Sequence, residues 1–108
     1  MAVKYDIVTQ QRDTYERSIQ AIGLNLVGAT AKMQVRKRYG DTDALLTLDL
    51  TSGLSFEGED VIVLNIPDES LEDIITFSVY DLFVTEASGE SHKIIYGTFK
   101  TLPSVTEV

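Results

Sequence analysis

The stretch TAKMQVRKR, residues 30–38, alternates apolar and polar side chains, and this alternation decides the fold class. Ala31, Met33 and Val35 fall on one side of an extended chain, and polar or basic residues fall on the other. A period of two is typical of a β-strand that buries one face. Lys37 falls on the apolar side, which predicts that the strand ends or twists at this point.

The same alternation recurs along the chain, between turns rich in Gly, Asp and Ser. Strands are predicted at residues 5–9, 15–21, 30–38, 44–50, 61–66, 76–86 and 93–102. Seven or eight short strands of this kind indicate an all-β fold, a β-sandwich. One segment differs, because PDESLEDII, residues 67–75, predicts one or two helical turns that cross between the sheet edges.

The composition indicates one domain, residues 1–108, without disulfides. A chain of 108 residues is long enough for one core, and we expect only residues 104–108 to form a free tail. The absence of cysteine excludes disulfides and thiolate metal sites and favours a reducing cytoplasm. We find no secretory signal and no apolar run that could cross a membrane. A net charge of −8 disfavours binding to nucleic acid or anionic lipid.

Residues suited to catalysis or cofactor binding are sparse, so we expect no enzyme, no cofactor and no metal. The only histidine, His92, lies in a predicted hairpin loop without a paired nucleophile. Carboxylates gather in two turns, at Glu57, Glu59 and Asp60 and at Asp68, Glu69, Glu72 and Asp73. Such loops suit calcium, but neither contains a DxDxDG-type array, and solvated turns explain them more simply.

Two other residues have predicted structural roles. Gly97 interrupts an otherwise continuous strand pattern, which predicts a β-bulge or a close approach of backbone. Tyr80 lies just before a strand that leads into the last hairpin, a position at which sandwiches often use a tyrosine hydroxyl to hold a loop.

Positive charge gathers on the predicted strand 30–38, although acidic residues outnumber basic ones 17 to 9. One interpretation is a solvated strip balanced by carboxylates of the adjoining hairpin. A second is a protein partner that contacts Lys32, Arg36, Arg38 and Tyr39, since Arg and Tyr are enriched at interface hot spots. Nucleic acid would require more stacking aromatics and a basic domain, so we expect none.

Five modest motifs follow one another in an order that is similar to a known family. They are QQRDTYERSI, LVGATAKMQVRKRYGDTDALLTL, VIVLNIP with its brief helix, VYDLFVTEASGE and IIYGTFKTLPSVTE, and the resemblance covers residues 6–107. In this order the chain resembles small phage tail proteins, in particular the N-terminal immunoglobulin-like domain of the upper baseplate protein of siphophages and its single-domain relatives. The resemblance implies a single immunoglobulin-like antiparallel β-sandwich.

The resemblance also implies a role as a non-enzymatic virion protein, made in the host bacterial cytoplasm. It implies an adaptor or anchoring subunit of a tail, baseplate or neck that binds other tail proteins in multiple symmetric copies. Because the sequence stops at Val108, we expect an anchor without a receptor-binding extension. In a head-to-tail ring the basic strand would face acidic loops of the next copy, at Glu57, Glu59, Asp60, Asp68, Glu69 and Asp73.

Two other functions remain as alternatives. A head decoration protein would share the virion but occupy another place in it. A carbohydrate-binding module would require two or three exposed aromatics on one face. The chain has no Trp, and we expect most Tyr and Phe side chains to point into the core.

Overall fold

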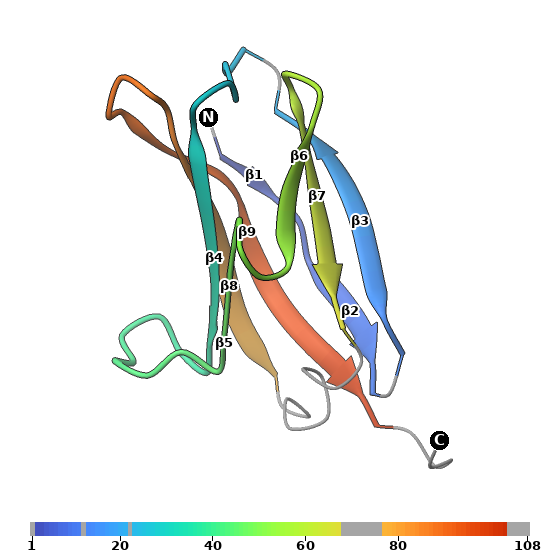
Figure 1. Ribbon diagram of the computed structural model, residues 1–108. Coiled ribbons are helices and arrows are strands. Elements are labelled where there is room, and N and C mark those ends of the chain that lie inside the picture. Colours follow the sequence, from blue (N-terminus) through green and yellow to red (C-terminus); the bar gives the residue numbers. More distant parts are fainter. Residues whose placement is uncertain (1, 12, 22, 68–76, 104–108) are drawn as a thin grey trace.

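The computed structural model describes residues 2–11, 13–21, 23–67 and 77–103. Over these ranges the chain forms two sheets that face one another (Figure 1). One sheet has the strand order β1-β9-β8-β4-β5, with β2 also paired to β9, and the other has the order β3-β7-β6. The strands are β1 (Val3–Lys4), β2 (Ile7–Gln10), β3 (Tyr15–Gln20), β4 (Thr30–Arg36), β5 (Leu46–Asp49), β6 (Leu54–Glu57), β7 (Val61–Ile66), β8 (Ser78–Thr85) and β9 (Ser91–Leu102).

The predicted alternation places the core correctly. Met33 and Val35 of β4 are fully buried, and so are the inward side chains of β7 and β8. These residues form one cluster with Phe99, whose ring meets Tyr80 edge-on at 6.3 Å between centroids. Each large apolar side chain buried in this way contributes about 1.5–3 kcal/mol. The strand β4 ends at Arg36, as predicted from the position of Lys37 on the apolar side of the alternation.

Several predicted details are wrong. The described ranges contain nine strands instead of seven or eight, because the first predicted strand is divided into β1 and β2 and because β6 lies in a stretch where no strand was predicted. The sandwich is mixed rather than antiparallel, since β1 and β2 both run parallel to β9. The strand predicted over 44–50 is shortened to β5, and Leu50 is exposed. The predicted helical crossover falls almost entirely on residues 68–76, outside the described residues.

The N-terminal segment (Val3–Gln10) is fastened to β9 and β8 at its bend. The amide of Tyr5 donates to the Tyr96 carbonyl at 2.8 Å, and the Tyr5 carbonyl accepts from the buried Tyr80 hydroxyl. The Asp6 carboxylate accepts from the Thr98 amide at 3.0 Å. Tyr80 therefore holds a loop through its hydroxyl, as its position predicted.

Gly97 makes the close approach possible. A Cβ atom at this position would lie 2.6 Å from the Tyr5 carbonyl oxygen and 2.8 Å from Asp6 Oδ1. The predicted close approach of backbone is thus confirmed, and the bulge lies elsewhere. Leu82 pairs with Ile95 but Phe83 pairs with Lys93, so the extra residue in β9 is Ile94.

Candidate partner-binding face

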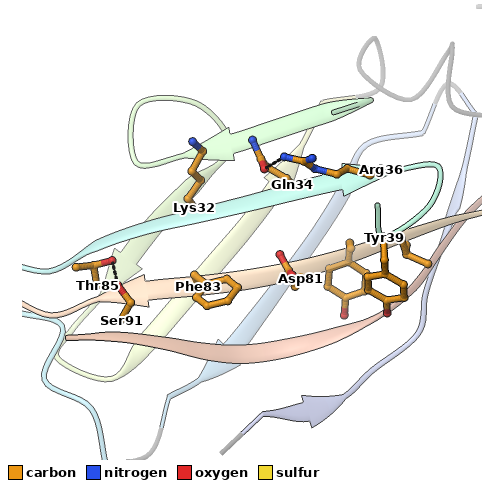
Figure 2. A pocket seen from close by; sticks show the side chains of 10 residues that line it. Lys32, Gln34, Arg36, Tyr39, Asp81, Phe83, Thr85 and Ser91 are labelled. Atoms are coloured by element: carbon orange, nitrogen blue, oxygen red, sulfur yellow. Dashed lines mark hydrogen bonds between the residues drawn. The ribbon is translucent and has the colours of Figure 1, made fainter. Parts of the chain in front are cut away.

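The outward surface of the larger sheet forms a shallow hollow of about 540 Å³. Its wall on β4 carries polar and basic side chains, and the neighbouring strand β8 contributes the aromatic ring of Phe83 (Figure 2). We call this surface the basic face; the side chains that define it are Lys32, Gln34, Arg36, Asp81, Phe83 and Lys93. The outward parity of β4 predicted the first three of these residues.

Lys32 is the most available cation of this face. It lies between two cross-strand neighbours, Asp49 on β5 and Phe83 on β8. Its ammonium group has no carboxylate within 4.0 Å among the residues that the structure describes. Hydrogen bonds from the side chain and amide of Thr51 hold the pKa of Asp49 below its usual value, and the charge of Lys32 adds to this effect. Asp49 therefore partly balances Lys32 without pairing with it.

The side chain of Arg36 forms hydrogen bonds within the protein. Its guanidinium donates to the Asp41 carbonyl oxygen and, at 2.8 Å, to Gln34 Oε1. A partner would have to compete with these bonds, so the sequence-based expectation that Arg36 contacts a protein partner overlooked an internal role. The same contact fastens the turn that carries Tyr39, whose side chain is 65% exposed. Arg38 is exposed in this turn and lies outside the strand in which it was predicted.

Phe83 and Lys93 belong to the face although sequence reasoning did not select them. Lys93 Nζ lies 5.6 Å from the Phe83 ring centre, 5.7 Å from that of Tyr96 and 3.9 Å from Asp81 Oδ2. The outward position of Phe83 could have been predicted from the alternation of β8, because Tyr80, Leu82 and Val84 point inward. The outward position of Lys93 could not be predicted from the alternation of β9, because the bulge at Ile94 reverses the side to which Lys93 points.

The first acidic turn, with Glu57, Glu59 and Asp60, does not adjoin the basic face. Glu57 ends β6, and Glu59 and Asp60 follow in the turn before β7, all in the smaller sheet. Asp60 Oδ2 accepts a hydrogen bond from Gln20 Nε2 at 3.0 Å, and its carbonyl oxygen accepts from Ala21. This turn thus has a structural role. The other predicted acidic residues, Asp68, Glu69 and Asp73, lie outside the described residues.

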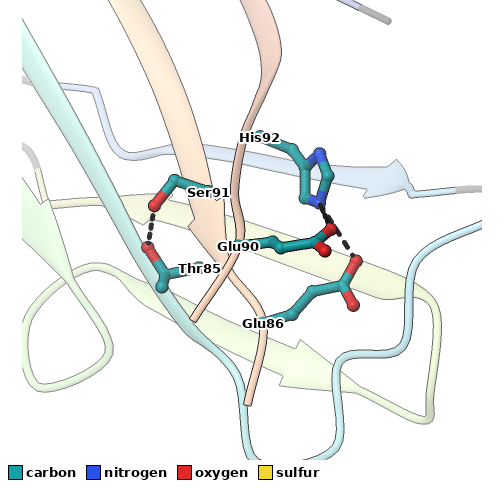
Figure 3. A network of polar contacts seen from close by, with 5 residues as sticks. All are labelled: Thr85, Glu86, Glu90, Ser91 and His92. Carbon is teal, nitrogen blue, oxygen red and sulfur yellow. Dashed lines mark hydrogen bonds and ion pairs between the residues drawn. The ribbon is translucent and has the colours of Figure 1, made fainter. Parts of the chain in front are cut away.

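His92 lies near the start of β9 and faces two carboxylates rather than a nucleophile. Its Nε2 atom is 3.2 Å from Glu86 Oε1 and 3.7 Å from Glu90 Oε2 (Figure 3). The neighbouring hydroxyls of Thr85 and Ser91 bond to each other at 2.9 Å. Within the described ranges, no cluster of His, Asp and Glu is arranged to hold a metal ion, and no helix is long and apolar enough to cross a membrane.

The comparisons with known proteins bear on the fold. The sequence matches no protein-family model and no curated protein. Among solved structures, the chain is similar to the second immunoglobulin domain of the mouse polymeric immunoglobulin receptor, with a TM-score of 0.52 and 14% identity. The match covers 97% of this chain and 100% of that domain. At this identity the similarity shows an immunoglobulin-like β-sandwich and no function.

Proposed function

We propose that this protein is a non-enzymatic structural protein of a bacteriophage virion, an adaptor or anchoring subunit that binds other proteins of the tail, baseplate or neck. The observation that carries the binding role is the basic face, where Lys32, which forms no ion pair with any described residue, lies beside the exposed ring of Phe83. The assignment to a phage tail is supported by the order of the sequence motifs and by the immunoglobulin-like fold that this order predicted.

The chemistry of the basic face defines the partner surface. Phe83 is 37% exposed and supplies apolar area, while Lys32 and Lys93 lie beside it. An acidic surface with an apolar centre would complement this arrangement, and the pairing of such potentials adds specificity and association rate. Truncation of a central aromatic residue at such an interface costs about 2 kcal/mol or more in binding.

The first test is the location of the protein. An antibody against the chain is used to ask whether the protein sediments with intact particles from the source lysate, and gold labelling shows where. Label at the tail, tail tip or neck is the expected result. Label on the capsid would instead support a head decoration protein. Absence from particles would refute the virion role.

The second test addresses the face itself. The Lys32→Glu/Phe83→Ala variant is expected to lose incorporation into particles, while Lys100→Glu changes an exposed cation outside the hollow and serves as the matched control. Arg36→Glu is less informative, because it also removes the donor to the Asp41 carbonyl. Circular dichroism verifies folding. Equal incorporation of both variants into particles would exclude the basic face as the partner-binding surface.

A carbohydrate-binding module is the second candidate, because two of the aromatic side chains that do not point into the core share one hollow. Tyr39 and Phe83 are both exposed and line the same hollow, and Tyr96 is half-buried nearby. Aromatic rings on one open face are what sugar binding requires. Binding to a glycan panel that disappears in Tyr39→Ala/Phe83→Ala would favour this function over the adaptor role.

A further inference from the structure

The outer edge of β3 has no neighbouring strand among the described residues. β3 pairs with β7, and the described part of the chain places no strand on its other side. The amide of Ala21 donates to the Asp60 carbonyl at 2.6 Å, which continues the register of this pair and assigns Tyr15, Arg17 and Ile19 to the bonds with β7. The backbone N–H and C=O groups of the three alternate residues therefore point away from the sheet; these are Glu16, Ser18 and Gln20.

This edge is open to another strand. Glu16, Ser18 and Gln20 are exposed, and β3 contains neither a proline nor a bulge that would prevent pairing. Arg17 is the one charged residue of inward parity, and its guanidinium lies 5.1 Å from the centre of the Tyr5 ring. A row of free backbone donors and acceptors of this kind is a template for β-strand addition.

We propose that β3 pairs with β3 of a second copy of this chain, antiparallel about a two-fold axis at Ser18. The two three-stranded sheets would then form one continuous sheet across the dimer. In this register Ser18 faces Ser18 of the second copy, and Glu16 faces Gln20 of the second copy. Each of these pairs consists of residues whose free backbone groups point outward, so each can exchange both N–H···O bonds.

Side-chain chemistry selects this register. The Gln20 carboxamide uses one N–H on Asp60, and its second N–H is free to donate to the Glu16 carboxylate of the second copy. A shift that centres the pair on Arg17 would place two guanidinium groups opposite each other, which is unfavourable. A shift that centres it on Ile19 would leave Glu16 and Tyr15 without a partner inside the strand. The Ser18 register leaves only Tyr15, which would face Ala21, without a partner inside the strand.

The inference is independent of the proposed function. β3 belongs to the smaller sheet, whereas the basic face belongs to the larger one. A failure of dimerisation therefore leaves the partner-binding role untouched, and a failure of virion incorporation leaves the dimer untouched.

Cysteine cross-linking tests the register directly, because the natural chain contains no cysteine. Residues in a hydrogen-bonded antiparallel pair have Cα atoms about 5.5 Å apart, which suits a disulfide. Ser18→Cys is expected to form a covalent dimer under mild oxidation. Glu16→Cys and Gln20→Cys are expected to cross-link only when the two variants are mixed. Cross-linking of Glu16→Cys alone at the rate of Ser18→Cys would refute the proposed register.

The reversible association is measured on the full chain by sedimentation equilibrium. Ser18→Pro removes an N–H that does not bond to β7, so the domain is expected to fold while the association constant falls about tenfold or more. Gln20→Lys is expected to strengthen association and Gln20→Glu to weaken it, since each faces Glu16 of the second copy. A protein that sediments as a monomer up to millimolar concentration would overturn the proposal.

Discussion

The edges of β9 and β3 border the same hollow of about 460 Å³, yet only one of them is covered. Along β9, the N-terminal segment occupies the edge through β1 and β2. Along β3, no described strand occupies the corresponding edge. The inward residues of β9, such as Ile95 and Phe99, are accordingly buried, whereas Arg17 of β3 is exposed and Ile19 is half-buried.

The difference teaches that the neighbours of a strand decide its burial as much as its own sequence does. The N-terminal segment pairs its backbone with β9, and it meets β3 through side chains, with the Tyr5 ring beside Arg17. Four changes can break or sharpen this comparison, from the largest expected effect to the smallest.

The strongest contrast is expected between two isoleucines that face the same hollow. Ile95→Ala on β9 removes a side chain that is 5% exposed, and we expect a loss of about 2–4 kcal/mol in the free energy of unfolding. Ile19→Ala on β3 is expected to cost about 1 kcal/mol, because its methyl groups already contact water. Urea denaturation measures both. Equal losses would show that the β3 side is as well packed as the β9 side.

Gly97→Ala tests the close approach that positions the N-terminal segment. The added methyl group would overlap the Tyr5 carbonyl, and we expect a loss of about 1–3 kcal/mol. Hydrogen exchange at the Tyr5 and Thr98 amides is expected to increase as the segment loosens. Gly40→Ala is the matched control, because nothing lies within 4 Å of its added Cβ atom. Unchanged exchange in Gly97→Ala would contradict the role of Gly97.

Tyr80→Phe removes the hydroxyl that donates to the Tyr5 carbonyl and leaves the ring in place. We expect a loss of about 1 kcal/mol, typical of one buried hydrogen bond. Burial raises the pKa of Tyr80 well above its usual value, so the hydroxyl stays a neutral donor throughout the physiological range. A stability difference between the two proteins that is constant from pH 6 to pH 9 is therefore predicted from thermal unfolding.

Asp6→Asn is expected to have the smallest effect and to depend on pH. The hydrogen bond from the Thr98 amide is the main reason that the pKa of Asp6 lies below its usual value. A lowered pKa in the folded state stabilises the protein above the unfolded pKa of about 4 and ceases to do so as pH falls through the folded value. The wild-type protein should therefore lose more stability than Asp6→Asn between pH 6 and pH 3. Asp43→Asn is the control, and parallel pH profiles for all three proteins would contradict the prediction.

Much of the fold follows from side-chain periodicity. The inward faces of β4, β7 and β8 were predictable because each strand has neighbours and one clear apolar face. The parallel pairing of the N-terminal segment was not, since it depends on contacts with Tyr80 and Gly97, which are distant in sequence. β6 was missed because a strand of four residues with two polar side chains gives a weak signal between turns.

The candidate site was predictable only in part. The outward position of Lys32 was predicted from the alternation of β4. The alternation of β8 would have predicted the outward position of Phe83 in the same way. The internal bonds of Arg36 depend on how the turn after β4 folds back, which no periodicity encodes. Lys93 reaches the face through a bulge whose position could not be read from glycine content, since the bulged residue is Ile94 rather than Gly97.

The parallel pairing of the N-terminal segment with β9 has a mechanical consequence. The chain enters this pair at Val3, beside Ile95, and leaves it at Leu102, beside Gln10 (Figure 1). A pull applied between Val3 and Leu102 would load the interstrand hydrogen bonds in shear, many of them at once. An antiparallel pair pulled from adjacent ends would open one bond at a time. Held between these two points, the domain is built to transmit tension as a stiff link.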